Sequence, residues 1–225
     1  MSDDGLAINN MKTIDLTPGG TRAQERAGCP ESVVEVRAQT IVVLDAAGTK
    51  VITERSTGFF VTSDGKLATT YYSVANATMV QVRTADGNIM QARVDRADPS
   101  RDIAILKVQR KRPGQTFQPM ALAESSDHLN ARDRLQGLVT SENCAELTEQ
   151  TGEFLGKRLA GANFELNFCD PRRAVLEIGM SAQPGSAGGP VTDRRGKVVG
   201  LLESAVMHNT VQAVPVEYLH RLLRS

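Results

Sequence analysis

The feature that most constrains the fold is a series of short runs in which apolar and polar residues alternate. These runs begin at Val33, and segments rich in Asp, Asn and Gly separate them, such as Ser63-Asp64-Gly65 and Ala85-Asp86-Gly87-Asn88. A period of two places alternate side chains on opposite faces of a strand, and these turn residues tolerate the backbone angles of tight hairpins. The sequence therefore predicts an all-β protein of many antiparallel strands.

The runs fall into two sets, separated by the polar, basic segment 109–115, which contains Pro113 and Gly114. The first set comprises 33–36, 41–44, 51–52, 58–61, 80–82, 92–94 and 103–108, and the second comprises 134–140, 164–168, 175–178, 198–202 and 211–214. A closing helix is expected at 215–225, because its apolar residues recur at helical spacing. The chain thus divides into two β units and a helix.

Two segments lack a clear pattern. Residues 1–28 show no sustained apolar period and include Pro18-Gly19-Gly20, so we expect a tail or linker outside the core. Residues 142–162 are equally irregular, and Glu146 to Gly156 fits either a helical turn or a mobile loop.

Composition argues against several function classes. The 26 Lys and Arg residues balance the 26 Asp and Glu residues, so no net charge attracts nucleic acid or an anionic membrane. Aromatic residues make up 4% of the chain and Trp is absent, which leaves few surfaces for base stacking. We expect no nucleic-acid partner.

Cysteine content and hydropathy leave the compartment open. The 3 cysteines, Cys29, Cys144 and Cys169, are too few for a disulfide framework, although a bridge between Cys144 and Cys169 stays open. The sequence has neither a signal-peptide start nor the ~18 apolar residues of a membrane-spanning helix. Contact with a membrane is expected only through a segment outside this sequence.

Three motifs resemble the trypsin-like serine proteases of the Deg/HtrA type. Gly185 to Pro190 reads Gly-Ser-Ala-Gly-Gly-Pro, similar to the nucleophile loop Gly-x-Ser-Gly-Gly-Pro, with Ala187 at the serine position. Ser56 to Thr69 looks like the hairpin that leads to the catalytic histidine, and Tyr72 stands at the histidine position.

The third motif runs from Asp98 to Val108 and closely matches the family pattern Asp-Pro-x-x-Asp-Ile-Ala-Leu-Leu-Lys-Val, which puts Asp102 at the place of the triad aspartate. The resemblance implies a chymotrypsin-like double β-barrel over 29–225, with barrels at about 29–110 and 116–214 and the helix at 215–225. It also implies an oxyanion-type loop formed by Gly185, Ser186 and Ala187, and a peptide groove bordered by Glu203, Ser204 and Ala205.

The residues at two of the three triad positions are unsuited to proteolysis. The methyl group of Ala187 cannot form an acyl intermediate, and a phenol such as Tyr72, with an ordinary pKa of about 10, is a poor general base near neutral pH. Asp102 then has no imidazole to orient. We therefore predict a pseudoprotease without cofactor that binds a protein or peptide partner, such as an active protease relative.

Two alternatives stay open. A metal-binding role would use His208, which falls near the expected groove, although the chain has no His-x-His or Cys-x-x-Cys spacing to support it. A serine endopeptidase inactivated by deliberate replacement of its serine would explain Ala187, but Tyr72 would still need a second change. Natural loss of the site covers both positions.

Overall fold

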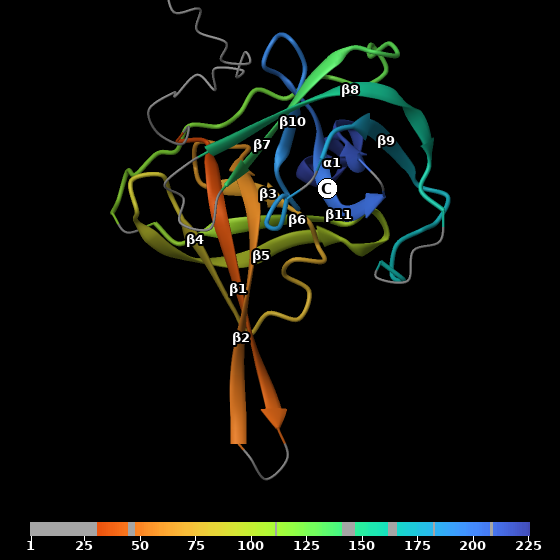
Figure 1. The fold of residues 1–225 in the computed structure, drawn as a ribbon. Coiled ribbons are helices and arrows are strands. Elements are labelled where there is room, and N and C mark those ends of the chain that lie inside the picture. Colours follow the sequence, from red (N-terminus) through yellow and green to blue (C-terminus); the bar gives the residue numbers. More distant parts are fainter. Residues whose placement is uncertain are drawn as a thin grey trace, which may run out of the picture.

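The strands of the molecule close into two antiparallel barrels that pack against each other (Figure 1). This arrangement comes from a computed structural model that describes residues 31–44, 48–110, 112–140, 147–161, 166–181, 183–207 and 209–225. The predicted all-β double barrel with a C-terminal helix is confirmed.

The first barrel has the strand order β1-β2-β3-β6-β5-β4. Two pairs of predicted runs are in fact single strands, because β1 and β2 stay paired to each other from Val33 opposite Phe59 to Leu44 opposite Gly48. The short β3 was not among the predicted runs. The strands are β1 (Val33–Leu44), β2 (Gly48–Phe60), β3 (Lys66–Thr69), β4 (Met79–Arg83), β5 (Ile89–Asp98) and β6 (Ile103–Val108).

The second barrel has the strand order β10-β11-β12-β9-β8-β7 and is followed by helix α1 (Val216–Arg224). Val216 and Leu219 are the buried residues of this helix, as its predicted apolar face requires. The strands are β7 (Arg134–Thr140), β8 (Leu147–Leu159), β9 (Ala174–Gly179), β10 (Pro190–Thr192), β11 (Val198–Met207) and β12 (Thr210–Pro215).

Two expectations about the second barrel were wrong. The stretch expected to be a helical turn or a loop contains the long strand β8, and the end of the expected strand 164–168 is a turn over 166–168. Strand β8 is held by pairing with β7 on one side and β9 on the other. Its Gly152, Gly156 and exposed Leu159 hide the alternation by which a strand is recognised.

A hydrophobic cluster joins the two barrels. It brings Phe59 and Ile105 of the first barrel against Leu201 and Val214 of the second, and Leu219 of the helix completes it. The loops that carry the sequence motifs meet beside this junction. No helix among the described residues is long and apolar enough to cross a membrane.

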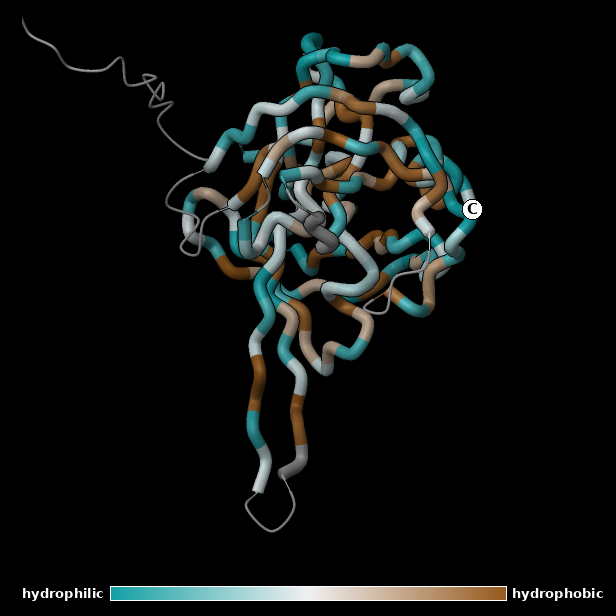
Figure 2. The backbone as a smooth tube through the Cα atoms, turned by 45° about the vertical axis from the view of Figure 1, so that its right-hand side comes forward, coloured by the Kyte–Doolittle hydropathy of each residue, from teal (hydrophilic) through white to brown (hydrophobic). Residues whose placement is uncertain are grey.

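The β1–β2 hairpin extends well beyond the first barrel as a two-stranded ribbon (Figure 1). Strand β4 pairs with β1 only from Glu35 to Gln39, so the part of the hairpin nearer its tip is held by its own ladder. Apolar residues lie exposed along this ribbon, where Figure 2 shows brown segments on both strands. They include Ile41, Val51 and Ile52.

Candidate functional site

The loop that carries Ala187 is fixed by contacts with both barrels. The backbone N–H of Thr57 in β2 donates to the Ala187 carbonyl at 2.8 Å, and the N–H of Gly188 donates to the Leu202 carbonyl of β11 at 2.9 Å. Gly188 has a φ of 83°, and a Cβ atom there would clash with the Thr57 carbonyl and with Thr69. Glycine is therefore required at the point where the loop crosses from one barrel to the other.

Within this loop the predicted oxyanion-type residues already have partners. The Thr57 hydroxyl donates to the Gly185 carbonyl at 2.7 Å. Ser186 is buried, its N–H donates to the Gln183 carbonyl at 3.0 Å, and its Oγ accepts from the Gln183 N–H at 2.9 Å. The serine beside Ala187 thus closes the turn that precedes it.

Asp102 lies fully buried at the start of β6, directly after the short 3₁₀ turn Pro99–Arg101. Its φ of 54° is in the left-handed region, which Asp tolerates better than most residues do. Its Oδ1 accepts the backbone N–H of Tyr72 at 2.7 Å, whereas Oδ2 has no hydrogen-bond partner among the described residues. The structure therefore brings Asp102 and Tyr72 into direct contact through the backbone.

Burial controls the protonation of this carboxyl group. The loss of hydration raises the pKa of Asp102 to about 7, although the Tyr72 N–H opposes the shift by stabilising the carboxylate. The negative charge of nearby Glu203 raises the pKa further, and Arg173 lowers it. Asp102 consequently changes charge near neutral pH.

Tyr72 and Ala187 line the same cavity, which has a volume of about 320 Å³. The Tyr72 side chain is not buried, since the residue is 39% exposed. A second cavity of about 450 Å³ shares Glu54, Tyr72 and Ser73 with the first and continues toward the base of the ribbon. The two motif positions thus line the first cavity, and Tyr72 lines both.

One wall of the first cavity is a buried ion pair that the sequence did not suggest. Glu203 lines the cavity but is only 1% exposed, and its two carboxylate oxygens lie 2.8 and 3.1 Å from the guanidinium nitrogens of Arg173. Burial raises the pKa of Glu203, while the charge of Arg173 opposes that shift. In the sequence, Arg173 stands out only by its position directly before the apolar run of β9.

The other predicted groove residues are less defined. Ser204 and Ala205 belong to β11, but their side chains lie outside the described residues. Cys169 is a free thiol whose Sγ donates to the Pro99 carbonyl at 3.4 Å, and burial raises its pKa to about 11. Cys29 and Cys144 lie outside the described residues, so the bridge between Cys144 and Cys169 is not part of the described structure.

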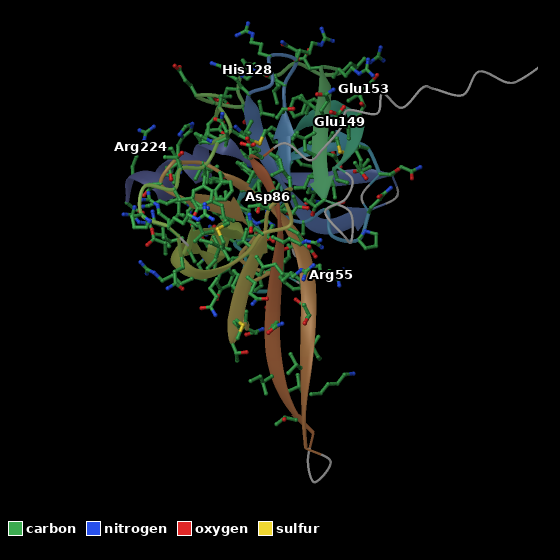
Figure 3. The ribbon with its side chains drawn as sticks, turned by 90° about the vertical axis from the view of Figure 1, so that its left-hand side faces the viewer. Arg55, Asp86, His128, Glu149, Glu153 and Arg224 are labelled. Carbon is green, nitrogen blue, oxygen red and sulfur yellow. The ribbon has the colours of Figure 1, made fainter. Side chains whose placement is uncertain are left out.

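Both described histidines lie away from the cavity lining. His128 contacts the Ser125 carbonyl at 2.9 Å and Asp193 at 3.3 Å, and Figure 3 places it far from Arg55, which lines the cavity. His220 contacts the Ala123 carbonyl at 2.7 Å. The metal candidate His208 lies outside the described residues, which contain no cluster of three or more His, Cys, Asp or Glu side chains that could hold a metal.

Comparison with known protein families identifies the family of this chain. Residues 56–201 match the trypsin-like peptidase domain. This chain belongs to the trypsin-like peptidase family. The matched range contains the residues of both contacts described above, Thr57 with Ala187 and Tyr72 with Asp102.

Curated relatives place the domain near the HtrA proteases, as the motifs suggested. Mitochondrial serine protease HTRA2 of Drosophila erecta is 26% identical over 204 residues, which cover 86% of this chain and 44% of that protein. HTRA2 of Bos taurus is 29% identical over 207 residues, which cover 84% and 42%. The chain therefore spans less than half the length of these relatives, and the Deg/HtrA resemblance is confirmed.

Solved structures agree on the fold. The Rv3671c protease in its inactive form has a TM-score of 0.68 and 23% identity, with 86% of this chain and 88% of that chain covered. The HtrA-type protease AlgW with a tripeptide has a TM-score of 0.69 and 19% identity, with 87% and 60% covered. The domain has the architecture of an HtrA-type protease.

Proposed function

We propose that this domain holds an extended polypeptide in the cavity beside Ala187 and does not hydrolyse it. The proposal rests on the lining of that cavity, where Tyr72 and Ala187 face the same space, Tyr72 is bonded to Asp102, and no imidazole is found among the lining residues that the structure describes. In this assignment Tyr72, Asp102 and Ala187 occupy the three triad positions.

Each step of serine proteolysis then lacks a group. The reaction needs a nucleophilic hydroxyl, an imidazole that takes and returns its proton, and a carboxylate that orients the imidazole. The Ala187 methyl group has no lone pair, and the neighbouring Ser186 Oγ is engaged by the Gln183 N–H. The carboxyl group of Asp102 accepts the backbone N–H of Tyr72, and neither of the two described histidines is hydrogen-bonded to it, so it orients no described imidazole.

Binding needs less than cleavage does. An extended peptide is held mainly by backbone hydrogen bonds to a sheet edge and by pockets for alternate side chains, and neither depends on a nucleophile. The cavities of about 450 and 320 Å³ share Glu54, Tyr72 and Ser73 in their linings, so they are neighbours on the surface that a bound chain would follow. A solved HtrA-type neighbour holds a tripeptide, which supports a protein or peptide as the partner here, including an active protease relative.

Restoring the two missing groups tests the proposal. We expect the wild-type chain, Tyr72→His and Ala187→Ser to stay unlabelled by a fluorophosphonate probe, because each lacks the base, the nucleophile or both. The double variant Tyr72→His/Ala187→Ser should be labelled. Adding Asp102→Asn to it should lower the labelling rate, by up to about 10⁴-fold, which is the loss seen when the aspartate of an intact triad is replaced by asparagine.

Two results would overturn the proposal. Labelling of the wild-type chain, or its hydrolysis of casein, would show a working site made from other residues. A folded double variant that stays unlabelled would show that Tyr72 and Ala187 do not hold the triad positions.

A further inference from the structure

In the part of the chain that the structure describes, no strand is paired to the outer edge of β2 over most of its length. Strand β2 pairs with β1 from Gly48 to Phe59, whereas on its other side β3 pairs only with Phe59 and Phe60. Among the described residues, no strand is paired to that edge between Thr49 and Thr57. An open strand edge presents backbone donors and acceptors to any chain that can align with it.

The structure shows which residues of β2 point their backbone N–H and C=O groups out from this edge. The N–H of Thr57 points away from β1, because it donates to the Ala187 carbonyl. Backbone groups alternate in direction along a strand, and the β1–β2 register has no shift in this region, so Thr53 and Val51 turn their N–H and C=O groups to the same side.

A contact on the opposite strand checks this assignment. Gln39 is the cross-strand partner of Thr53, and its carbonyl accepts the N–H of Thr78 on the outer side of β1. In an antiparallel ladder the two members of such a pair both point outward or both point inward. The outward direction of Gln39 therefore requires the outward direction of Thr53.

The surroundings of this edge suit an apolar ligand. Val51 is 56% exposed on one face of the ribbon. On the other face, Ile52 is 41% exposed and lines the 450 Å³ cavity together with Ala38 and Phe168. The edge also begins at the candidate site, since Thr57 at its inner end is bonded to Ala187.

We propose that the β2 edge at Val51 and Thr53 binds the part of the polypeptide that extends past the candidate site, as an added strand. The ligand is an extended segment with aliphatic side chains at alternate positions, whose inward side chains enter the cavity beside Ile52. This inference rests on the proposed function, and it assigns the ribbon as a second part of the same binding surface.

The first test maps the hydrogen bonds from the side of the ligand. A random decapeptide library displayed on phage is selected on the wild-type chain, and the tightest peptide is synthesised with a fluorescent label. We expect N-methylation of its backbone to weaken binding at least tenfold at every second position along the segment that follows the site. Uniform effects, or none, would overturn the added strand.

The second test uses a matched pair of proline variants. Thr53→Pro removes an outward N–H on the β2 edge, whereas Ile41→Pro removes an outward N–H on the far edge of the same ribbon. Proline is tolerated at both because neither N–H serves the β1–β2 ladder. We expect Thr53→Pro to weaken the peptide at least tenfold and Ile41→Pro less than twofold, with both melting temperatures recorded.

A third variant separates this inference from the proposed function. The Ala187→Trp variant fills the cavity at the candidate site. If this variant loses peptide binding while Thr53→Pro keeps it in full, binding at the β2 edge is refuted and the proposed function still holds. Failure to select any peptide, or a peptide insensitive to Ala187→Trp, refutes the proposed function itself. A wild-type dimer that Thr53→Pro dissociates would instead make the edge a contact between two copies.

Discussion

The loop around Ala187 and the β1–β2 ribbon meet at Thr57 but are held in opposite ways. The loop is bonded to both barrels, and Gly188 fits where no side chain could. The ribbon beyond the barrel is held by its own ladder, and at its base the Thr40 hydroxyl donates to the Asn76 carbonyl. The loop is thus fixed between the two barrels, whereas the outer edge of β2 in the neighbouring ribbon has no strand paired to it among the described residues.

This contrast predicts that removing a buried charge beside the candidate site costs far more stability than changes on the ribbon. Glu203→Ala leaves the buried Arg173 guanidinium without its partner, so we expect a loss of about 3–5 kcal/mol in the free energy of unfolding. Urea denaturation followed by circular dichroism measures it.

The matched control replaces both partners with apolar residues of similar size, Arg173→Met with Glu203→Leu. We expect this double variant to stay within about 2 kcal/mol of the wild type, because no charge is left buried alone. A loss below about 1 kcal/mol for Glu203→Ala would show that water reaches the ion pair. The predicted difference in stability cost between the buried pair and the ribbon would then be wrong.

A smaller effect follows from Asp102. Its pKa is about 7 in the folded chain and near 3.8 when exposed, so the folded state binds the proton more tightly between these values. The stability that protonation provides is therefore full below about pH 4 and is lost as the pH rises through 7. From pH 5 to pH 7 the wild type should lose about 2 kcal/mol relative to Asp102→Asn.

Asn is the suitable replacement because it keeps an oxygen for the Tyr72 N–H and tolerates the left-handed backbone of position 102. Parallel urea titrations of the two proteins at each pH give the difference. A constant difference across this range would mean that Asp102 is already charged in the folded chain at pH 5.

Much of the fold was predictable because alternation and turn residues act locally. The motifs also singled out Tyr72, Asp102 and Ala187: Tyr72 and Ala187 line one cavity, and the buried Asp102 accepts a hydrogen bond from the backbone of Tyr72. Strand β8 was not predictable, because two glycines and exposed leucines blur its period and its neighbours supply the hydrogen bonds. Arg173 was missed because nothing local to it shows that Glu203, distant in sequence, will meet it in the core.

The ribbon shows the same limit. Its two strands looked like four short runs, because no local signal tells where a hairpin leaves its barrel. Its open edge became visible only from the pairing of β2 with β1 and β3.

The proposed function requires that this domain bind an extended polypeptide and leave it intact. The most direct measurement incubates the selected decapeptide with the wild-type chain at saturating concentration for a day, reads binding by fluorescence anisotropy and then records the mass spectrum of the peptide. We expect a saturated complex and a single peak at the mass of the uncut peptide. Fragments that accumulate in proportion to the amount of protein, and that are absent with Ala187→Trp, would contradict it.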